Sequence, residues 1–293
     1  MALADILNAA RATPISGTEL RLHFNIMPAG EYSVVERAED RAADAPMVSC
    51  LMVTTGERPS IQHAIECYSR QTYANRELVV VTHPDGLETT AAFVAASGAP
   101  NVSVHCVGRE MTLGDCRNLA IARAAGRIVM QWDDDDLSDP LRVAVAVSVL
   151  IQSAAVAVVL SRVLIWWPQR RLAAISERRI WEGSIAVWRE HAPAYPSLAR
   201  AEDTPALAFL VNTRRVATYD CPLLYVYTAH AANTWGQTHF EQLFQRAECV
   251  IDGAAYVELL ALLAQRTPVV GYQADLPPRG TTPALAGEPT LVG

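Results

Sequence analysis

The sequence lacks three features that would assign it to common classes of protein. Its six cysteines are scattered without any C-x-x-C pair, so nothing indicates a disulfide framework. The segment Met1–Asp5 has neither the charged nor the apolar region of a signal peptide. The formal net charge is -7, and the chain contains no block of basic residues. A nucleic-acid partner is therefore not expected. A reducing, cytoplasmic location is therefore expected, and peripheral contact with the inner face of a membrane stays open.

One apolar stretch, Val143–Leu160, approaches the length of a transmembrane span. Ser138–Pro140 precedes it and supplies a helix start, with proline at the first helical position. Val156–Leu160 and Val163–Trp167 are β-branched and aromatic, which favours strands, and Gln152–Ser153 marks the break between helix and strand. The stretch is therefore predicted to be a helix followed by a buried strand.

Strand-like and helix-like segments alternate regularly from Val48 onwards. Continuous apolar runs, typical of parallel strands that are covered on both faces, occupy residues 48–53 and 78–81, and further strands are predicted over 102–107 and 127–132. Helices are predicted between them, from Ser60 to before Tyr73, over 87–96 and over 112–125. Thr112 and Asp115 form a capping box at the start of the last helix. This alternation predicts an open, doubly wound, mostly parallel α/β sheet with right-handed crossovers.

With 293 residues and 51% hydrophobic content, the chain can bury a sizeable core as one large domain with appendages. Residues 1–46 show no βαβ pattern and are expected to form an N-terminal cap, with Leu20–Ile26 as a strand. Residues 47–245 form the main domain, whose second half is expected to extend the same sheet over the substrate. Residues 246–293 are expected to hold a C-terminal helix and a tail that is irregular beyond Thr267.

Four consecutive aspartates, Asp133–Asp136, follow directly on the apolar run that ends at Trp132. In an extended segment alternate carboxylates point the same way, roughly 7 Å apart, and repel by about 2 kcal/mol. A divalent cation would offset this cost, and hard carboxylate oxygens suit Mg²⁺ or Mn²⁺. A solvated acidic turn is the simpler reading, although such runs normally sit in polar stretches. An EF-hand is excluded because Ser138 and Ala144 occupy the positions that need glycine and glutamate.

Polar segments follow three of the predicted parallel strands, at the point where each strand ends. They are Thr54–Arg58, Thr82–Gly86 and Asp133–Asp136. In open α/β sheets ligands bind beyond the carboxyl ends of the strands. The three segments are therefore expected to converge on one crevice.

The chain resembles family 2 glycosyltransferases of the GT-A fold over Met47–Phe244. The matching pieces, in order, are Thr55–Pro59, Gly114–Gly126, Gln131–Pro140, the pair Glu202–Asp203, and His230–Trp235. The resemblance implies a Rossmann-like, nucleotide-binding half and a mixed acceptor-binding half. It also implies a nucleoside diphosphate sugar as donor, with UDP as the expected nucleotide, and a divalent metal across its two phosphates.

The family's D-x-D-D pattern gives the aspartates different roles. Asp133 is implied to lie near the ribose or base, and Asp135 to bind the metal with Asp136 just after it. Because the run has four members, the register stays open by one residue. Asp134 therefore remains a candidate for the nucleotide site.

The resemblance also implies nucleotide contacts from the other two segments. Thr55 and Asp85 match positions that hold the nucleobase, and Glu57 and Arg58 belong to the same loop as Thr55. The family's usual Asp-Asp-Gly is replaced here by Thr82–Gly86, which reads Thr-His-Pro-Asp-Gly. The preference for uridine therefore stays open.

Two further sets of residues are implied to face the donor. Arg117 and Asn118 lie in the first turn of a predicted helix, where free amides and the helix dipole favour an anion. His230 would complete the metal shell or contact a phosphate, although a lone histidine is as often structural. A solvated surface arginine is the alternative for Arg117.

An inverting transfer needs a general base that deprotonates the acceptor hydroxyl. Asp203 matches the family's base, and Glu202 is held in reserve. An acid at a helix start often serves only as an N-cap. Thr204 can take that role if Pro205 is the first helical residue, which would free Asp203 for catalysis.

Aromatic residues and a glycine are candidates for contacts with sugar or acceptor, namely Trp181, Gly183 and Trp235, although core packing explains a strand tryptophan equally well. The acceptor is expected to be a saccharide, a lipid-linked molecule or another hydroxyl compound. Two other functions stay open: a sugar nucleotidyltransferase, and a nucleotide-sugar or metal-binding module without turnover. The first usually needs a glycine-rich, basic loop after the first strand, which Thr55–Arg58 does not provide.

Overall fold

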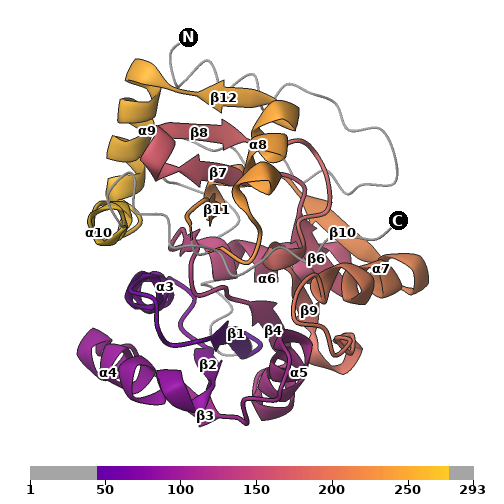
Figure 1. Ribbon diagram of the computed structural model, residues 1–293. Coiled ribbons are helices and arrows are strands. Elements are labelled where there is room, and N and C mark those ends of the chain that lie inside the picture. The colour runs from indigo at the N-terminus through magenta and orange to yellow at the C-terminus, as the bar shows by residue number, and fades with distance from the viewer. Residues whose placement is uncertain (1–44, 232, 277–293) are drawn as a thin grey trace, which may run out of the picture.

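The computed structural model describes residues 45–231 and 233–276 (Figure 1). The cap and the strand predicted within residues 1–44 lie outside the described residues, as does the tail from residue 277. Within the described ranges no helix is both long and apolar enough to cross a membrane.

A seven-stranded sheet forms the lower half of Figure 1, with strand order β10-β6-β9-β4-β1-β2-β3. Its strands are β1 (Val48–Thr54), β2 (Arg76–Thr82), β3 (Val102–Cys106), β4 (Ile128–Gln131), β6 (Ala157–Leu160), β9 (Ala186–Trp188) and β10 (Val216–Tyr219). The block β3-β2-β1-β4 is parallel, and β9 pairs antiparallel with both β4 and β6. The predicted mostly parallel sheet is confirmed.

Helices cover both faces of this sheet, because the strands are apolar on both sides. Val48, Cys50 and Met52 of β1 pack with α3 (Ser60–Ser69) in one buried cluster. Leu51, on the opposite face, packs with α5 (Leu113–Arg123) in a second cluster. The sheet is therefore doubly wound. The remaining helices of this half are α4 (Leu87–Ser97), α6 (Arg142–Ser153) and α7 (Asp203–Thr213).

Two helix starts differ from the prediction, and one is confirmed. The capping box of Thr112 and Asp115 is present in full. The helix expected to begin at Pro140 begins instead at Arg142, because Leu137–Ser138 is taken up by the short strand β5. Helix α7 begins at Asp203 after Glu202, and the side chain of Thr204 does not cap it.

The second half of the chain does not simply extend the first sheet, as the sequence suggested. It adds β6, β9 and β10 to that sheet, but it also builds a separate five-stranded sheet in the order β12-β8-β7-β11-β5. The strands are β5 (Leu137–Ser138), β7 (Leu164–Trp167), β8 (Leu172–Ile175), β11 (Tyr225–Thr228) and β12 (Cys249–Ile251). An apolar run specifies a strand but not its partner, so the sequence could not distinguish the two sheets.

Three helices pack on the second sheet, and they are α8 (Gln237–Arg246), α9 (Gly253–Ala264) and α10 (Val269–Asp275). Helix α10 corrects the prediction of irregular structure beyond Thr267. Its Tyr272 is fully buried against Trp166 of β7, with ring centroids 5.7 Å apart. The helix also contacts α3 through Asp275, which lies 2.7 Å from His63. It therefore joins the two halves of the fold.

Candidate active site

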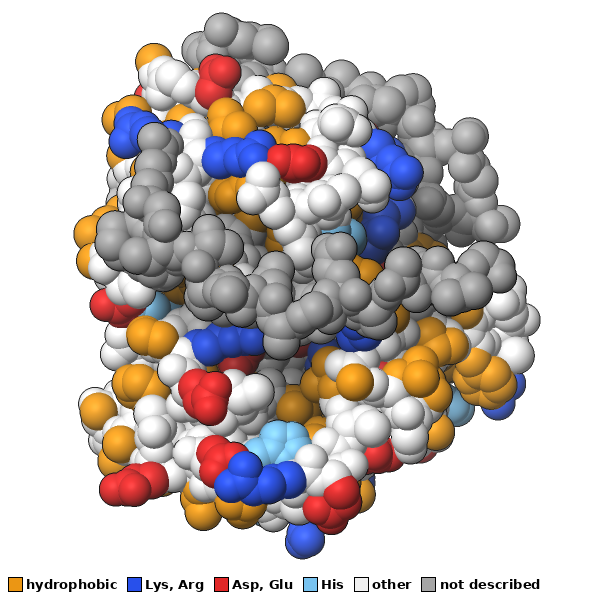
Figure 2. Space-filling view, viewed as in Figure 1, with side chains coloured by type: hydrophobic (Ala, Val, Ile, Leu, Met, Phe, Trp, Pro, Cys, Tyr) orange, Lys and Arg blue, Asp and Glu red, His pale blue; other side chains and the backbone are white. Residues whose placement is uncertain are grey.

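A cavity of about 620 Å³ lies between the two sheets, at the carboxyl ends of β1 and β4. Figure 2 shows acidic and basic side chains side by side in the hollow between the upper and lower halves of the molecule. Residues from all three polar segments line it, including Thr55, His83 and Asp133. The expected convergence of these segments on one crevice is confirmed.

Most of the candidate residues line this cavity, namely Thr55, Arg58, Arg117, Asp133, Asp134, Asp135, Asp136, Trp181, Gly183, Glu202, Asp203 and Trp235. Glu57, Asp85, Asn118 and His230 do not belong to its lining. The amide of Asn118 donates to the carbonyl of Tyr195 and accepts from its backbone N–H, at 2.7 and 2.9 Å. Asn118 therefore fixes a loop rather than facing the cavity.

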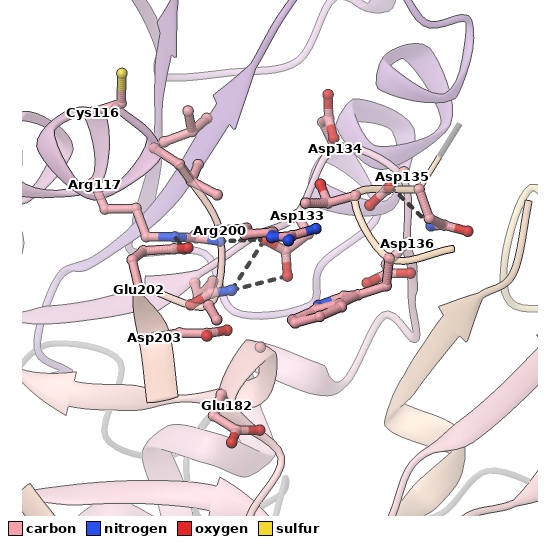
Figure 3. A pocket seen from close by; sticks show the side chains of 18 of the residues that line it. Cys116, Arg117, Asp133, Asp134, Asp135, Asp136, Glu182, Arg200, Glu202 and Asp203 are labelled. Carbon is pink, nitrogen blue, oxygen red and sulfur yellow. Dashed lines mark hydrogen bonds and ion pairs between the residues drawn. The ribbon is translucent and has the colours of Figure 1, made fainter. Parts of the chain in front are cut away.

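The four aspartates do not form the extended segment that the sequence suggested, because Asp134 and Asp135 lie in a turn. Their carboxylates consequently point in different directions (Figure 3). Asp133 accepts hydrogen bonds from Gln131 and from Tyr225, the latter at 3.1 Å. It thus faces the β4 side of the cavity.

Asp134 turns toward the end of β1. The Thr54 hydroxyl donates to its Oδ2 at 2.5 Å, and the Arg58 guanidinium lies 4.0 Å from its Oδ1. Burial and the neighbouring charge of Asp135 raise the pKa of Asp134 to about 7, against the opposing effects of Arg58 and Thr54. Asp134 therefore keeps its proton to a higher pH than a free aspartate does.

Asp135 is surrounded by donors. Its Oδ2 lies 3.1 Å from Arg58, 3.2 Å from His230 and 3.3 Å from Asn233. Burial alone would raise the pKa of Asp135, but the hydrogen bond and charge of His230, with Arg58 and Asn233, lower it overall. Its backbone carbonyl accepts a hydrogen bond from Tyr272 at 2.6 Å. Asp135 thus keeps its negative charge more readily than a free aspartate does.

Asp136 is held by the second sheet. Its Oδ2 accepts from the Tyr225 hydroxyl, and its Oδ1 accepts from the backbone N–H of Thr228 at 2.8 Å. Burial, together with the charges of Asp135 and Asp133, raises the pKa of Asp136 well above its usual range. Both oxygens are already engaged, so this carboxyl connects the aspartate loop to β11.

On the opposite side of the cavity, Arg117 forms ion pairs with both Asp133 and Glu202. Its Nε donates to Glu202 at 2.5 Å, and its Nη2 lies 3.2 Å from Asp133. The side chain of Glu202 is only 2% exposed. Although burial opposes it, the charges of Asp133 and Glu202 raise the pKa of Arg117 overall. Arg117 is therefore not a solvated surface arginine.

Asp203 occupies the first turn of α7, next to this pair (Figure 3). Burial raises the pKa of Asp203 to about 6, and the charges of Glu202, Glu182 and Asp133 add to this effect while Arg117 opposes it. No hydrogen bond to another described residue holds its carboxylate in place. A carboxylate that is ionised at neutral pH but basic enough to accept a proton has the properties of a general base.

Several residues of the cavity escaped the sequence analysis, among them His83, Gln131, Glu182, Arg200, Tyr225 and His239. Local sequence carried little sign of them. Tyr225 is the first residue of β11, and its contact with Asp136 spans 89 positions in the sequence. Only the pairing of β11 with β5 brings the two together.

A divalent cation fits the donors that are present. The described residues contain no group of three or more His, Cys, Asp or Glu side chains that could hold a metal by themselves. Asp135 and His230 nevertheless offer a carboxylate oxygen and a ring nitrogen 3.2 Å apart. Mg²⁺ typically takes one or two protein ligands and fills its shell with water and substrate phosphates. The site therefore matches a metal that binds together with a diphosphate.

Comparisons with solved structures agree with this architecture. The chain resembles TarS residues 1–349 of S. aureus in complex with UDP, with TM-score 0.52, 14% identity, and coverage of 67% of this chain and 69% of that one. It resembles the mannosyltransferase PcManGT of Pyrobaculum calidifontis in complex with GDP-Man and Mn²⁺, with TM-score 0.50, 21% identity, and coverage of 75% and 70%. Glucosyl-3-phosphoglycerate synthase of Mycobacterium tuberculosis, in complex with Mg²⁺ and UDP, gives TM-score 0.51, 15% identity, and coverage of 90% and 89%.

These likenesses concern the fold, which is that of GT-A enzymes. No curated protein matches the chain by sequence. The sequence model described as Glycosyl transferase family 2 matches residues 49–195, which is half of the chain. This range contains β1 to β4 and all four aspartates of the cavity. The chain therefore belongs to glycosyl transferase family 2.

Proposed function

We propose that this glycosyltransferase is metal-dependent and inverting, and that it moves a sugar from a nucleoside diphosphate sugar to an acceptor hydroxyl. The observation that carries the proposal is that one cavity holds two carboxylates, Asp135 and Asp203, whose pKa values are shifted in opposite directions. Asp135, whose pKa is lowered, lies on one wall of the cavity and is contacted by His230. A carboxylate of raised pKa, Asp203, lies on another wall beside Arg117. The solved relatives that carry UDP, or GDP-Man with Mn²⁺, support a donor of this class.

The donor side of the site consists of Thr55, Arg58 and Asp135, with His230 behind Asp135. Asp135 and His230 would hold Mg²⁺ or Mn²⁺, and Asp136, whose oxygens are engaged by Tyr225 and Thr228, would position the loop. When bound, the metal stabilises the negative charge of the departing diphosphate. Arg58, which pairs with Asp135, provides a further cation at this wall.

The chemical step is a displacement at the anomeric carbon. The acceptor oxygen forms a bond to that carbon while the bond from the carbon to the diphosphate oxygen breaks, and the anomeric configuration inverts. Asp203 accepts the proton of the acceptor hydroxyl. Its raised pKa, about 6, suits this transfer near neutral pH.

Arg117 and Glu202 act on the pKa of Asp203 in opposite directions, since the charge of Arg117 lowers it and the charge of Glu202 raises it. The pair is almost fully buried, and Glu202 immediately precedes Asp203 at the start of α7. The carboxylate of Glu202 accepts a hydrogen bond from Arg117 and is only 2% exposed, so it is the less accessible of the two acids. Asp203 is therefore the base in this proposal, and Glu202 positions the arginine.

The acceptor side carries aromatic and cationic groups. The guanidinium carbon of Arg179 lies 4.3 Å from the centroid of the Trp181 ring. Trp235 stacks on His239, with ring centroids 5.1 Å apart. Aromatic faces of this kind commonly pack on sugar rings. A saccharide, or the sugar end of a lipid-linked molecule, is the acceptor class that these residues suit best.

Donor binding tests the proposal first. The melting temperature would be measured with UDP-sugars and GDP-sugars, each with Mn²⁺ and with EDTA. A ligand present at about 100 times its Kd stabilises the folded protein by about 2.7 kcal/mol. Stabilisation that requires Mn²⁺ is expected, and its absence with every donor would refute the assignment. The anomeric configuration of the product, determined by NMR, tests inversion.

A further inference from the structure

The acceptor side of the cavity, around Trp181 and Trp235, carries positive charge in a protein whose formal net charge is -7. Arg179 and Arg200 both line the cavity. Arg179 pairs with Glu182 at 2.7 Å, so the charges of these two side chains offset each other. No acid among the described residues pairs with Arg200. Arg200 therefore brings an uncompensated positive charge to this side of the cavity.

The aromatic and cationic side chains of this side are contiguous, although they come from three separate segments. The guanidinium carbon of Arg200 lies 5.7 Å from the centroid of the Trp235 ring, and Trp235 stacks on His239. Burial, and after it the charge of Arg179, lowers the pKa of His239, so Arg179 lies close to this imidazole. Arg179 in turn lies over Trp181. We call these five residues the cationic wall.

The loop that carries Arg200 is held in place by α5. The backbone N–H of Gly114 donates to the carbonyl of Leu198 at 3.1 Å. A Cβ at Gly114 would collide with the carbonyl of Pro196, so glycine permits this close approach. Immediately after Arg200, Ala201 adopts a left-handed φ of 56°, which a residue with a Cβ keeps only when its surroundings impose it. The backbone at Arg200 is therefore fixed relative to the cavity.

The cationic wall lies beside the residue proposed to act as general base. Arg200 precedes Asp203 by three positions, and both side chains line the pocket in Figure 3. The charge of Glu182, the ion-pair partner of Arg179, contributes to the raised pKa of Asp203. An acceptor whose hydroxyl reaches Asp203 would therefore have the cationic wall next to the rest of its structure.

We propose that the acceptor carries an anionic group, a phosphate or a carboxylate, near its reacting hydroxyl, and that Arg200 is the specificity-determining residue that binds this group. This inference rests on the function proposed above. The planar guanidinium can donate two parallel hydrogen bonds to the oxygens of either anion. Trp235 supports the guanidinium from one side, and its ring offers an apolar face to a sugar.

Binding of three sugars that differ only at C6 tests the proposal. Glucose, glucose 6-phosphate and glucuronate would be titrated by ligand-observed NMR into the protein saturated with Mg²⁺ and with UDP or GDP, whichever binds. The wild type should bind the two anionic sugars at least tenfold more tightly than glucose, the value of one charge-assisted hydrogen bond. In Arg200→Gln the three sugars should bind within about threefold of one another, and the affinity for the nucleotide should stay within about twofold of the wild type.

A matched variant controls for the loss of one positive charge. Arg214→Gln removes an exposed arginine that follows α7 and does not line the cavity, and it should keep the wild-type preference. Three results would overturn the anionic acceptor while leaving the proposed function intact: no binding of either anionic sugar to the wild type, equal binding of all three sugars, or an undiminished preference in Arg200→Gln. Weaker nucleotide binding in Arg200→Gln would assign Arg200 to the donor instead. Failure of both nucleotides to bind overturns the proposed function as well.

The source of the anion is identified by vesicles. Co-sedimentation would compare vesicles of phosphatidylglycerol with vesicles of phosphatidylcholine, for the wild type and Arg200→Gln. Binding to phosphatidylglycerol that requires Arg200, in addition to binding of glucose 6-phosphate, assigns the anion to a lipid headgroup. Binding of the anionic sugars without binding to either vesicle assigns it to a soluble acceptor.

Discussion

Replacing Asp203 with asparagine should lower the rate of catalysis and raise the stability of the fold. Both effects have one cause, because the burial that makes Asp203 a stronger base also makes its negative charge unfavourable in the folded protein. Burial, with the neighbouring charges of Glu202 and Glu182, raises the pKa of Asp203 from 3.8 to about 6. At neutral pH the folded protein therefore holds a carboxylate that would be more stable in the unfolded chain. Asparagine has a similar shape and no charge to bury.

The size of the effect follows from this difference in pKa. A carboxyl that titrates at about 6 in the folded state and at 3.8 in the unfolded state costs up to about 3 kcal/mol at pH 7. Because Asp203 is only partly buried, solvent screening reduces this to about 1–2 kcal/mol. Asp203→Asn should therefore raise Tm by roughly 2–6 °C while lowering kcat by a factor of about 10²–10⁴.

The sign of the pH dependence is fixed by the same shift. Between pH 3.8 and about 6 the unfolded chain has released the proton and the folded protein has not, so rising pH destabilises the wild type at this group. The stability advantage of Asp203→Asn should thus be absent below about pH 4 and complete above about pH 6. The kcat/KM of the wild type should fall below about pH 6, because the base becomes protonated.

Denaturant unfolding at pH 4 and pH 7, with steady-state assays of the same samples, measures both effects. Asp252→Asn is the matched control, because Asp252 is an exposed acid immediately before a helix, outside the cavity. It should change neither stability nor rate. An Asp203→Asn protein that is less stable than the wild type at pH 7, or one that keeps full turnover, would refute the reasoning.

Four further substitutions test the groups in and around the cavity. Asp135→Asn should abolish the stabilisation by Mn²⁺ with nucleotide. Asp136→Asn keeps a carbonyl oxygen that can accept the hydrogen bond from the Thr228 backbone N–H, so this variant should retain most of the stabilisation. An equal loss in both variants would contradict the assignment of Asp135 as the metal ligand. Tyr272→Phe removes the donor to the Asp135 carbonyl and should raise the Mn²⁺ concentration for half-maximal activity several-fold, with unfolding easier by about 1 kcal/mol. Arg117→Met leaves Glu202 buried without its cation and should cost about 3–5 kcal/mol in urea unfolding; a loss below 1 kcal/mol would show that the pair is solvated.

The nucleotide-binding half was predictable because its signals are local. Strands β1 and β2 contain the apolar runs Cys50–Val53 and Leu78–Val81, which is what a parallel strand buried on both faces requires. The capping box of Thr112 and Asp115 fixes the start of α5 within four residues. The rule that ligands bind at the carboxyl ends of parallel strands then placed Thr55 and the aspartates at one crevice.

The roles of the individual aspartates were not predictable, because they depend on partners far away in the sequence. Asp136 is engaged by Tyr225 and Thr228 of the second sheet, which the sequence did not distinguish from the first. Asp135 is kept ionised by His230, 95 positions later, and by Arg58 on the β1 loop. Alternation along a strand was the wrong guide, since the run bends into a turn.

The sequence by itself thus determined the sheet, the crevice and the excess of negative charge, because hydrophobic periodicity and strand ends are properties of short segments. Only the tertiary structure decided which carboxyl has a raised pKa, which has a lowered one and which titrates at about pH 6. Burial and neighbouring charges set a pKa, and both are fixed only when β11, α7 and α10 close around the aspartates.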